Sequence, residues 1–133
     1  MHLIVCIDDR CGLSFAGRRL STDRKLIEKI VGMAEHFKLW IEPYSEKLFD
    51  NGNIFVSPDY LNKAGPGEYC FLEREIQLVP KERLESIILC RWNRAYPSTE
   101  KFPRELLADM CLVHTEDFPG NSHEKITIER YIP

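Results

Sequence analysis

The sequence predicts an α/β domain with a mixed, mostly parallel sheet, flanking helices and a C-terminal antiparallel hairpin. Two observations support this fold class. Short apolar runs, typical of buried strands, alternate with helical stretches, as in parallel βαβ units. The last two strand-like segments are joined by a single loop instead, which favours antiparallel pairing. With 133 residues the chain has the size of one domain, and we expect a single domain over residues 1–133.

The first third of the chain contains the clearest elements. Residues 2–8 form a short β-branched run that ends at a charged residue, which predicts a buried strand. Residues 9–20 show no period and are predicted to be a long loop. An apolar stripe at helical spacing then predicts a helix over residues 22–37, capped by Ser21 or Thr22. The stripe consists of Leu26, Ile27, Ile30, Val31, Ala34 and Phe37.

The remaining elements are shorter. Further strands are predicted at residues 39–41, 54–56, 69–72, 87–92, 111–115 and 125–132. Helical turns are predicted at residues 44–49, 58–62 and 104–109, and a turn at residues 80–83. Residues 93–103 are predicted to be irregular. In the last strand Ile126, Ile128 and Ile132 alternate with polar residues and Tyr131, which indicates one buried face.

Charge and hydropathy limit the partners and the compartment. The net charge is −3, from 18 basic and 21 acidic residues, and the basic residues are not gathered in one tail. This argues against nucleic acid as the main partner. The start MHLIVCIDD does not resemble a signal peptide, and no stretch approaches the roughly 20 apolar residues of a membrane helix. We therefore expect a cytoplasmic protein with no membrane contact.

The five cysteines show no metal-binding spacing. Cys6, Cys70 and Cys90 fall inside apolar strand-like runs, where free cysteine behaves as a small buried hydrophobe. Cys11 lies in a polar loop. There is no CxxC pair and the histidines are scattered, so no metal site is predicted. Whether the chain uses a cofactor, and which one, is left open by the sequence.

Three polar clusters follow predicted strands, where ligands usually bind in open α/β sheets. The first combines Asp8, Asp9 and Arg10 with Arg18 and Arg19 ahead of the long helix. Arginines beside a helix N-terminus suit phosphate or carboxylate groups. Alternatively, the two aspartates pair with Arg18 and Arg19 and hold the loop. No GxGxxG or GxxxxGK[ST] motif accompanies the cluster.

The second cluster is Arg91-Trp92-Asn93-Arg94, followed by Tyr96. Tryptophan and arginine are frequent anchors of recognition surfaces, although Trp92 can equally belong to the core. The third cluster runs from Asn121 to Lys125 and contains His123, a candidate for acid–base chemistry. Glu124 is a poor partner for His123, because adjacent residues of an extended chain point apart. Alternatively, this segment is a hairpin loop whose Asn121 and Ser122 cap the turn.

The segments CIDDRCGLSFAGRRLSTDR, RWNRAYP and DFPGNSHEKIT resemble a family of short bacterial proteins, some of which are called ribonuclease Z. The residues do not support that name, because the HxHxDH zinc motif is absent. The opening LIVCIDD, the segment YSEKLF and the late FPGNS resemble dihydrofolate reductase. This second resemblance implies that fold. It does not carry over NADPH binding or folate reduction, because WIEPYSEKLF and LCRWNRAY stand in place of that family's Gly-Arg and Gly-Gly pairs.

These observations lead to one main hypothesis and two alternatives. The chain is expected to bind a small anionic ligand or a protein partner, which includes a second copy of itself. The first alternative is an enzyme for a phosphorylated or nucleotide-like substrate, and the second is an RNA-associated protein. We further expect the segments 9–20 and 91–97 to face each other across one anion-accepting pocket. The candidate ligand-binding residues are Asp9, Arg10, Arg18, Arg19, Arg91, Asn93, Arg94 and His123.

Overall fold

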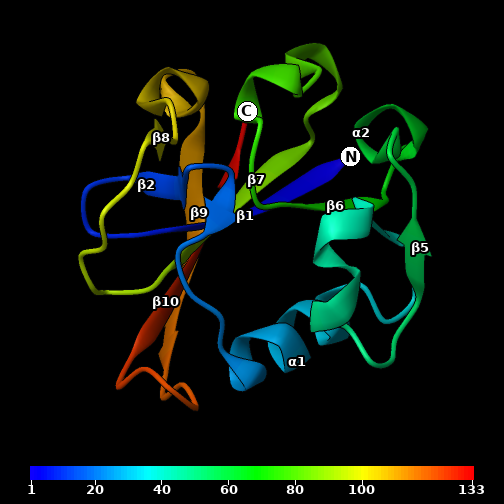
Figure 1. Cartoon of the computed structure of the whole chain (residues 1–133). Coiled ribbons are helices and arrows are strands. Elements are labelled where there is room, and N and C mark those ends of the chain that lie inside the picture. The colour runs from blue at the N-terminus through cyan, green and yellow to red at the C-terminus, as the bar shows by residue number, and fades with distance from the viewer.

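Strand β1 (His2–Ile7) runs through the middle of a seven-stranded sheet with the order β5-β4-β6-β1-β7-β10-β9 (Figure 1). The computed structural model describes residues 1–133. The other strands of this sheet are β4 (Leu39–Ile41), β5 (Ile54–Val56), β6 (Tyr69–Leu72), β7 (Ser86–Arg91), β9 (Cys111–Phe118) and β10 (Ile126–Ile132).

The strand directions confirm the predicted fold class. Strands β5, β4, β6, β1 and β7 pair in parallel, and β10 pairs antiparallel with both β7 and β9. Strand β9 extends three residues beyond the predicted end at Thr115. The alternation predicted for the last strand holds for Ile126 and Ile128, which are buried, and is interrupted by a register shift between Arg130 and Tyr131.

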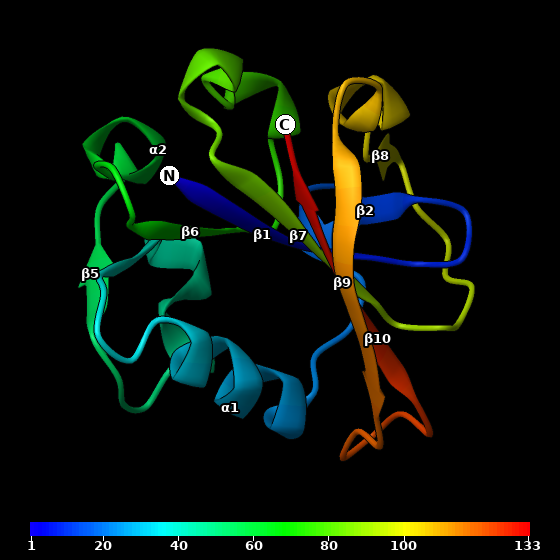
Figure 2. The same ribbon diagram turned by 180° about the vertical axis from the view of Figure 1, so that it is seen from behind.

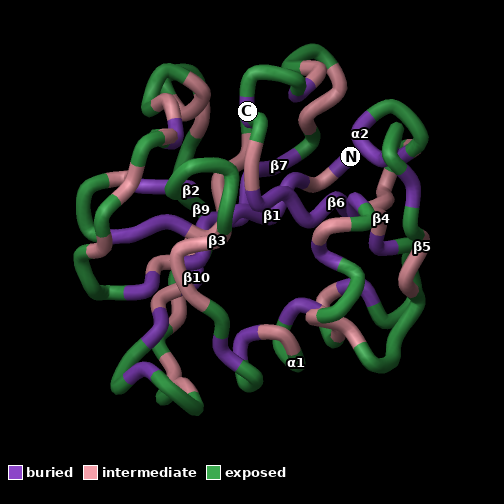
Figure 3. The backbone as a smooth tube through the Cα atoms, in the orientation of Figure 1, coloured by how far each residue is buried: buried purple, intermediate pink, exposed green.

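The sheet has an apolar layer on each face. Leu3, Val5 and Ile7 of β1 point into one layer, which also takes in helix α2 (Tyr60–Lys63). Ile4 lies in the other layer, with helix α1 (Arg24–Met33). Figures 1 and 2 show α1 on one side of the sheet and α2 on the other. Figure 3 shows that the buried backbone concentrates in the central strands.

Helix α1 is shorter than predicted and is capped by a different residue. Its N-cap is Asp23, whose side chain accepts hydrogen bonds from the backbone N–H groups of Lys25 and Leu26. The predicted caps Ser21 and Thr22 precede it. The predicted stripe packs as expected at Leu26, Ile30 and Ala34, which are at most 2% exposed. The helix ends at Met33 rather than near Phe37, and the Phe37 side chain is exposed.

Residues 9–20 were predicted to be a loop without regular structure, and this prediction was wrong, because they contain a β-hairpin. Strands β2 (Gly12–Phe15) and β3 (Arg18–Arg19) pair antiparallel, and β2 also pairs with β8 (Glu100–Lys101) inside the segment predicted to be irregular. Ala16 and Gly17 form the turn with φ angles of 50° and 76°. Two consecutive positive φ angles are typical of two-residue hairpin turns. The sequence did not predict this turn, because Ala-Gly stands where Asn-Gly or Asp-Gly is usual.

Four short helical segments complete the chain, and three of them lie close to predicted turns. They are the 3₁₀ helices η1 (Pro43–Leu48), η2 (Ile76–Leu78), η3 (Lys81–Arg83) and η4 (Arg104–Leu107). Cys70 and Cys90 are buried as predicted, Cys6 is partly buried and Cys111 is exposed. No helix of the structure has the length and apolar character needed to cross a bilayer.

Candidate functional site

A buried hydrogen-bond network joins the N-terminus of α1 to the loop between β9 and β10. Nδ1 of His123 lies 3.1 Å from Oδ2 of Asp23, and both side chains are at most 1% exposed. The indole of Trp92, which directly follows β7, stacks on the imidazole of His123 with ring centroids 4.6 Å apart. Three distant segments of the chain therefore meet at His123.

Asp23 is held in its ionised form by several donors. Its carboxylate accepts backbone N–H groups from Asn121 and Ser122 as well as those of the α1 N-terminus. Burial alone would raise the pKa of Asp23. The N–H groups of Asn121 and Ser122, together with His123, outweigh burial and hold this pKa well below its usual range. An ionised carboxylate only accepts hydrogen bonds, so Asp23 fixes the direction of the bond to His123.

The opposite ring nitrogen of His123 faces two hydroxyl groups. Nε2 lies 3.2 Å from Oγ of Ser21 and 3.0 Å from the phenol oxygen of Tyr96. Because Nδ1 donates to Asp23, the neutral ring carries its proton there and leaves Nε2 as an acceptor. Nε2 can thus accept a proton from a hydroxyl group. Asp23, His123 and Ser21 form an acid–histidine–hydroxyl array of the kind that activates nucleophiles.

Gly120 allows the loop to approach α1 this closely. A methyl group at its Cα would lie 2.6 Å from Oδ2 of Asp23 and 2.8 Å from the backbone oxygen of His123. Neither oxygen can move freely, because one belongs to the backbone and the other accepts several hydrogen bonds. A side chain at position 120 is therefore incompatible with the observed network.

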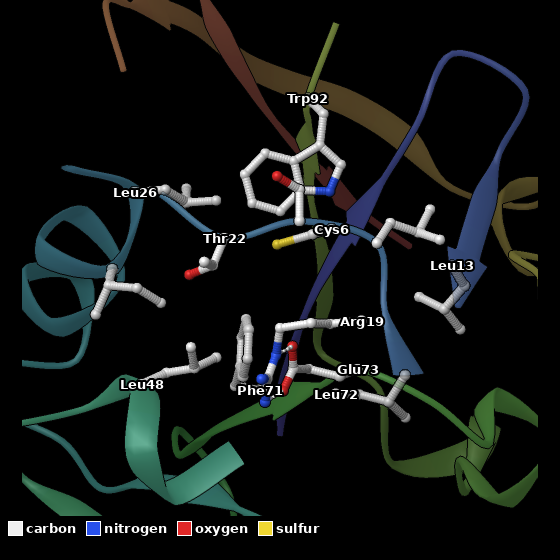
Figure 4. A pocket seen from close by; sticks show the side chains of 13 residues that line it. Cys6, Leu13, Arg19, Thr22, Leu26, Leu48, Phe71, Leu72, Glu73 and Trp92 are labelled. Atoms are coloured by element: carbon white, nitrogen blue, oxygen red, sulfur yellow. Dashed lines mark hydrogen bonds and ion pairs between the residues drawn. The ribbon is translucent and has the colours of Figure 1, made fainter. Parts of the chain in front are cut away.

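A narrow pocket opens between this network and the carboxyl ends of β1, β6 and β7 (Figure 4). It encloses about 350 Å³ of unfilled space including its mouth, but the centre of a water molecule fits in only about 20 Å³ of it. Most of the wall is apolar. The lining residues are Cys6, Leu13, Arg19, Leu20, Ser21, Thr22, Leu26, Ile27, Leu48, Phe71, Leu72, Glu73 and Trp92.

One ion pair forms the polar end of the pocket. The guanidinium of Arg19 lies beside the carboxylate of Glu73, with Nε 2.8 Å from Oε2, and Figure 4 shows the pair near Phe71. Ser45 donates a further hydrogen bond to Glu73. The ring of Tyr44 stacks against the Arg19 guanidinium, with Cζ of Arg19 4.5 Å from the ring centroid. The hydrogen bond to Glu73 raises the pKa of Arg19, so Arg19 and Glu73 neutralise each other in the pocket wall.

The first predicted cluster is divided between the pocket and the surface. Arg19 lines the pocket, whereas Asp9, Arg10 and Arg18 are exposed. The alternative interpretation, in which Asp8 and Asp9 pair with Arg18 and Arg19, is wrong for Arg19, because its ion pair is with Glu73. Asp8 is buried and accepts the backbone N–H groups of Arg10, Gly12 and Tyr96.

The second cluster lies next to the first but points elsewhere. The Asp9 N–H donates to the Arg94 carbonyl, so the two predicted segments contact each other directly. Arg94 itself is exposed. Arg91 binds Glu129 at 2.7 Å. Asn93 has a φ of 59° and donates to the carbonyl of Lys125 and to Thr127. Arg19 is the one arginine of segments 9–20 and 91–97 that lines the pocket.

The third cluster supplies the centre of the network, although not for the reason considered from the sequence. His123 is buried and its carboxylate partner is Asp23, which is 100 positions away. Asn121 and Ser122 donate to Asp23 rather than capping their own turn. Sequence reasoning missed Ser21, Asp23 and Tyr96 as members of this site. The available signal was the Ser-Thr-Asp run ahead of the helix, of which Ser21 and Thr22 were interpreted only as candidate caps.

No family model and no curated protein matches the chain. Among solved structures, the chain is similar to a dihydrofolate reductase from Enterococcus faecalis described as complexed with NADP(H) and RAB-propyl. The TM-score is 0.69 at 9% identity, over 98% of this chain and 94% of that chain. The fold is thus of the dihydrofolate reductase type, as the second resemblance in the sequence implied. At this identity the likeness extends to the fold alone.

Proposed function

We propose that this chain binds a small, uncharged organic molecule with an apolar body in the pocket beside Trp92. The observation that carries the proposal is the pocket's position and lining. It lies at the carboxyl ends of three neighbouring parallel strands, where open α/β sheets commonly bind ligands. An apolar wall with a few convergent polar groups is typical of small-molecule sites.

The charges of the wall favour a neutral ligand over the anionic ligand expected from the sequence. Arg19 is the lining cation, and Glu73 already binds it. An anion would have to displace Glu73, which is 7% exposed and would lose its partner in a poorly solvated position. A neutral amide or carbonyl group can instead accept or donate a hydrogen bond beside the intact pair.

The narrow interior implies that the pocket widens on binding. Leu20, Ser21 and Thr22 line it from the connection between β3 and α1, which is neither helix nor strand. Movement of such a segment breaks few backbone hydrogen bonds, so it is the natural element to give way. A single-ring ligand suits the available space better than a dinucleotide. The bulky segments that follow β4 and β7, in place of glycine pairs, agree with a single small ligand.

Three ring compounds of the same shape test this proposal: benzamide, benzoate and benzamidine, which are neutral, anionic and cationic. Each is added at millimolar concentration and the thermal midpoint of unfolding is measured. A ligand that binds only the native state raises the midpoint. We expect benzamide to raise it most. A shift with benzoate alone would favour the anionic ligand, and no shift with any compound would refute the proposal.

A matched pair of variants locates the binding. Leu48 lines the pocket and is partly exposed, so the larger side chain of Leu48→Trp takes up space in the pocket and should abolish the benzamide shift. Leu78 is exposed on η2, outside the pocket lining. Leu78→Trp introduces the same side chain at that site and should retain the shift. Equal shifts in the two variants would place the binding elsewhere.

A further inference from the structure

We propose that Ser21 is a nucleophile, activated by His123 and Asp23, that cleaves small acyl esters bound in the pocket. This inference rests on the proposed ligand pocket. Ser21 combines two properties that no other hydroxyl group of the network has: its Oγ lies 3.2 Å from Nε2 of His123, and it belongs to the pocket wall.

An activated hydroxyl group needs a base that accepts its proton, a group that orients this base, and shielding from water. The carboxylate of Asp23 orients the imidazole through Nδ1, and Nε2 is left to accept the serine proton. Asp23 and His123 are both buried, so the hydrogen bond between them does not compete with bulk water. Tyr96 also reaches Nε2, but it does not line the pocket. Its phenol group is placed to position the ring and not to attack a substrate.

A backbone N–H group is available for the oxyanion. The N–H of Thr22, the residue after the nucleophile, donates to no group of the protein. Thr22 lines the pocket beside Ser21 and lies one residue before the cap of α1, so it is next to the positive end of the helix dipole. An N–H from the residue after the nucleophile is a recurring oxyanion donor in serine hydrolases.

The reaction follows from these positions. Ser21 Oγ attacks the ester carbonyl carbon while its proton passes to Nε2 of His123, and the carbonyl oxygen becomes an oxyanion facing the Thr22 N–H. The C–O bond to the alcohol then breaks, and His123 returns the proton to the leaving oxygen. Water, deprotonated by the same Nε2, attacks the acyl-serine, the bond between the acyl carbon and Ser21 Oγ breaks, and His123 returns the proton to Oγ as the carboxylic acid leaves. The narrow apolar wall, with Leu26 and Phe71, favours short uncharged acyl groups.

Covalent labelling tests this directly in the full chain. Phenylmethanesulfonyl fluoride sulfonylates activated serines with loss of fluoride, and peptide mass spectrometry identifies the residue modified. We expect the label on Ser21, and none there in Ser21→Ala. Hydrolysis of p-nitrophenyl acetate should fall about 100-fold or more in Ser21→Ala, the scale expected when a general base loses its target. No label on wild-type Ser21 would overturn the inference.

The chain provides a matched control. Ser86 Oγ lies 2.6 Å from Nδ1 of His2, at the other end of the parallel strands, and no carboxylate binds that imidazole. Ser86→Ala removes a serine–histidine hydrogen bond without touching the pocket and should keep both the label and the rate. Equal loss in Ser86→Ala would also overturn the inference.

Benzamide binding separates this inference from the proposed function. Ser21→Ala should still show the benzamide shift, because the wall of the pocket loses only a hydroxyl group. If benzamide binds and Ser21 stays unlabelled, the pocket stands and the nucleophile does not. If benzamide fails as well, the proposed function itself has failed.

Discussion

The carboxylate of Asp23 binds the imidazole of His123 at 3.1 Å and caps helix α1 with its other oxygen. One side chain thus ends a helix and orients a histidine that lies 100 positions further along the chain. The two roles are linked, because any change that withdraws the β9–β10 loop also removes donors from the cap. The site and the start of α1 should therefore lose their order together.

Replacing Asp23 by Asn should make the free energy of unfolding depend less on pH in the acidic range. The pKa of Asp23 is below its ordinary value of 3.8 in the folded state, so the native state resists protonation. Such a group stabilises above its unfolded pKa, and this contribution is lost as the pH falls towards the folded pKa. Asn still caps a helix but carries no charge. The free energy of unfolding, measured by urea titration from about pH 5 to about pH 2.5, should fall more steeply for wild type than for Asp23→Asn. Parallel curves would contradict this.

Substituting Gly120 by Ala should destabilise the protein by about 1–3 kcal/mol, the usual cost of forcing a group into a filled space. The added methyl group meets Oδ2 of Asp23 at 2.6 Å. Gly65→Ala is the control, because the nearest atom to its added methyl group lies 3.6 Å away, an ordinary contact. Chemical denaturation of both variants measures the difference. Similar losses at the two positions would show that the loop does not need this approach.

Truncating Ile30 to Ala should cost about 2–5 kcal/mol of stability. Ile30 is fully buried in the layer between α1 and the sheet, together with Ile4 and Phe71. Glu28→Ala, on the exposed side of the same helix, removes a side chain without opening a cavity and should change stability little. A near-zero loss for Ile30→Ala, measured by urea unfolding, would mean that α1 presents a different face.

Removing divalent metal should leave the thermal midpoint unchanged. The structure brings together no group of three or more His, Cys, Asp or Glu side chains suited to a metal ion, so a closed set of ligands has no place to form. Unfolding is followed by circular dichroism with and without EDTA. A large drop in the midpoint after chelation would reveal a site that the arrangement of side chains does not suggest.

The elements that could be predicted are those whose signal is local. The stripe of Leu26, Ile30 and Ala34 repeats at helical spacing, and the run from Leu3 to Ile7 is apolar throughout, so both elements were recovered. The hairpin of β2 and β3 was missed because Ala16 adopts a φ of 50° without the Asn or Asp that usually marks such a turn.

The site depended on contacts that no local pattern encodes. The arginines and His123 were found from residue type and from their place near strand ends. Their partners were not found, because Glu73, Glu129 and Asp23 lie 54, 38 and 100 positions from Arg19, Arg91 and His123. Pairing across such distances is decided by strand order, which composition and spacing do not specify.

The same spacing has a consequence for how the protein is made. During synthesis β1 emerges first, but its partner β7 follows more than 80 residues later, and the donors to Asp23 follow later still. An unfinished chain holds apolar strands without neighbours and a helix without its outer contacts, a state that exposes it to aggregation. The residues that line the pocket have all been translated once Trp92 has emerged, but the histidine on which Trp92 stacks follows later, in the β9–β10 loop. The walls of the pocket are thus made before the Asp23–His123 network beside it can form.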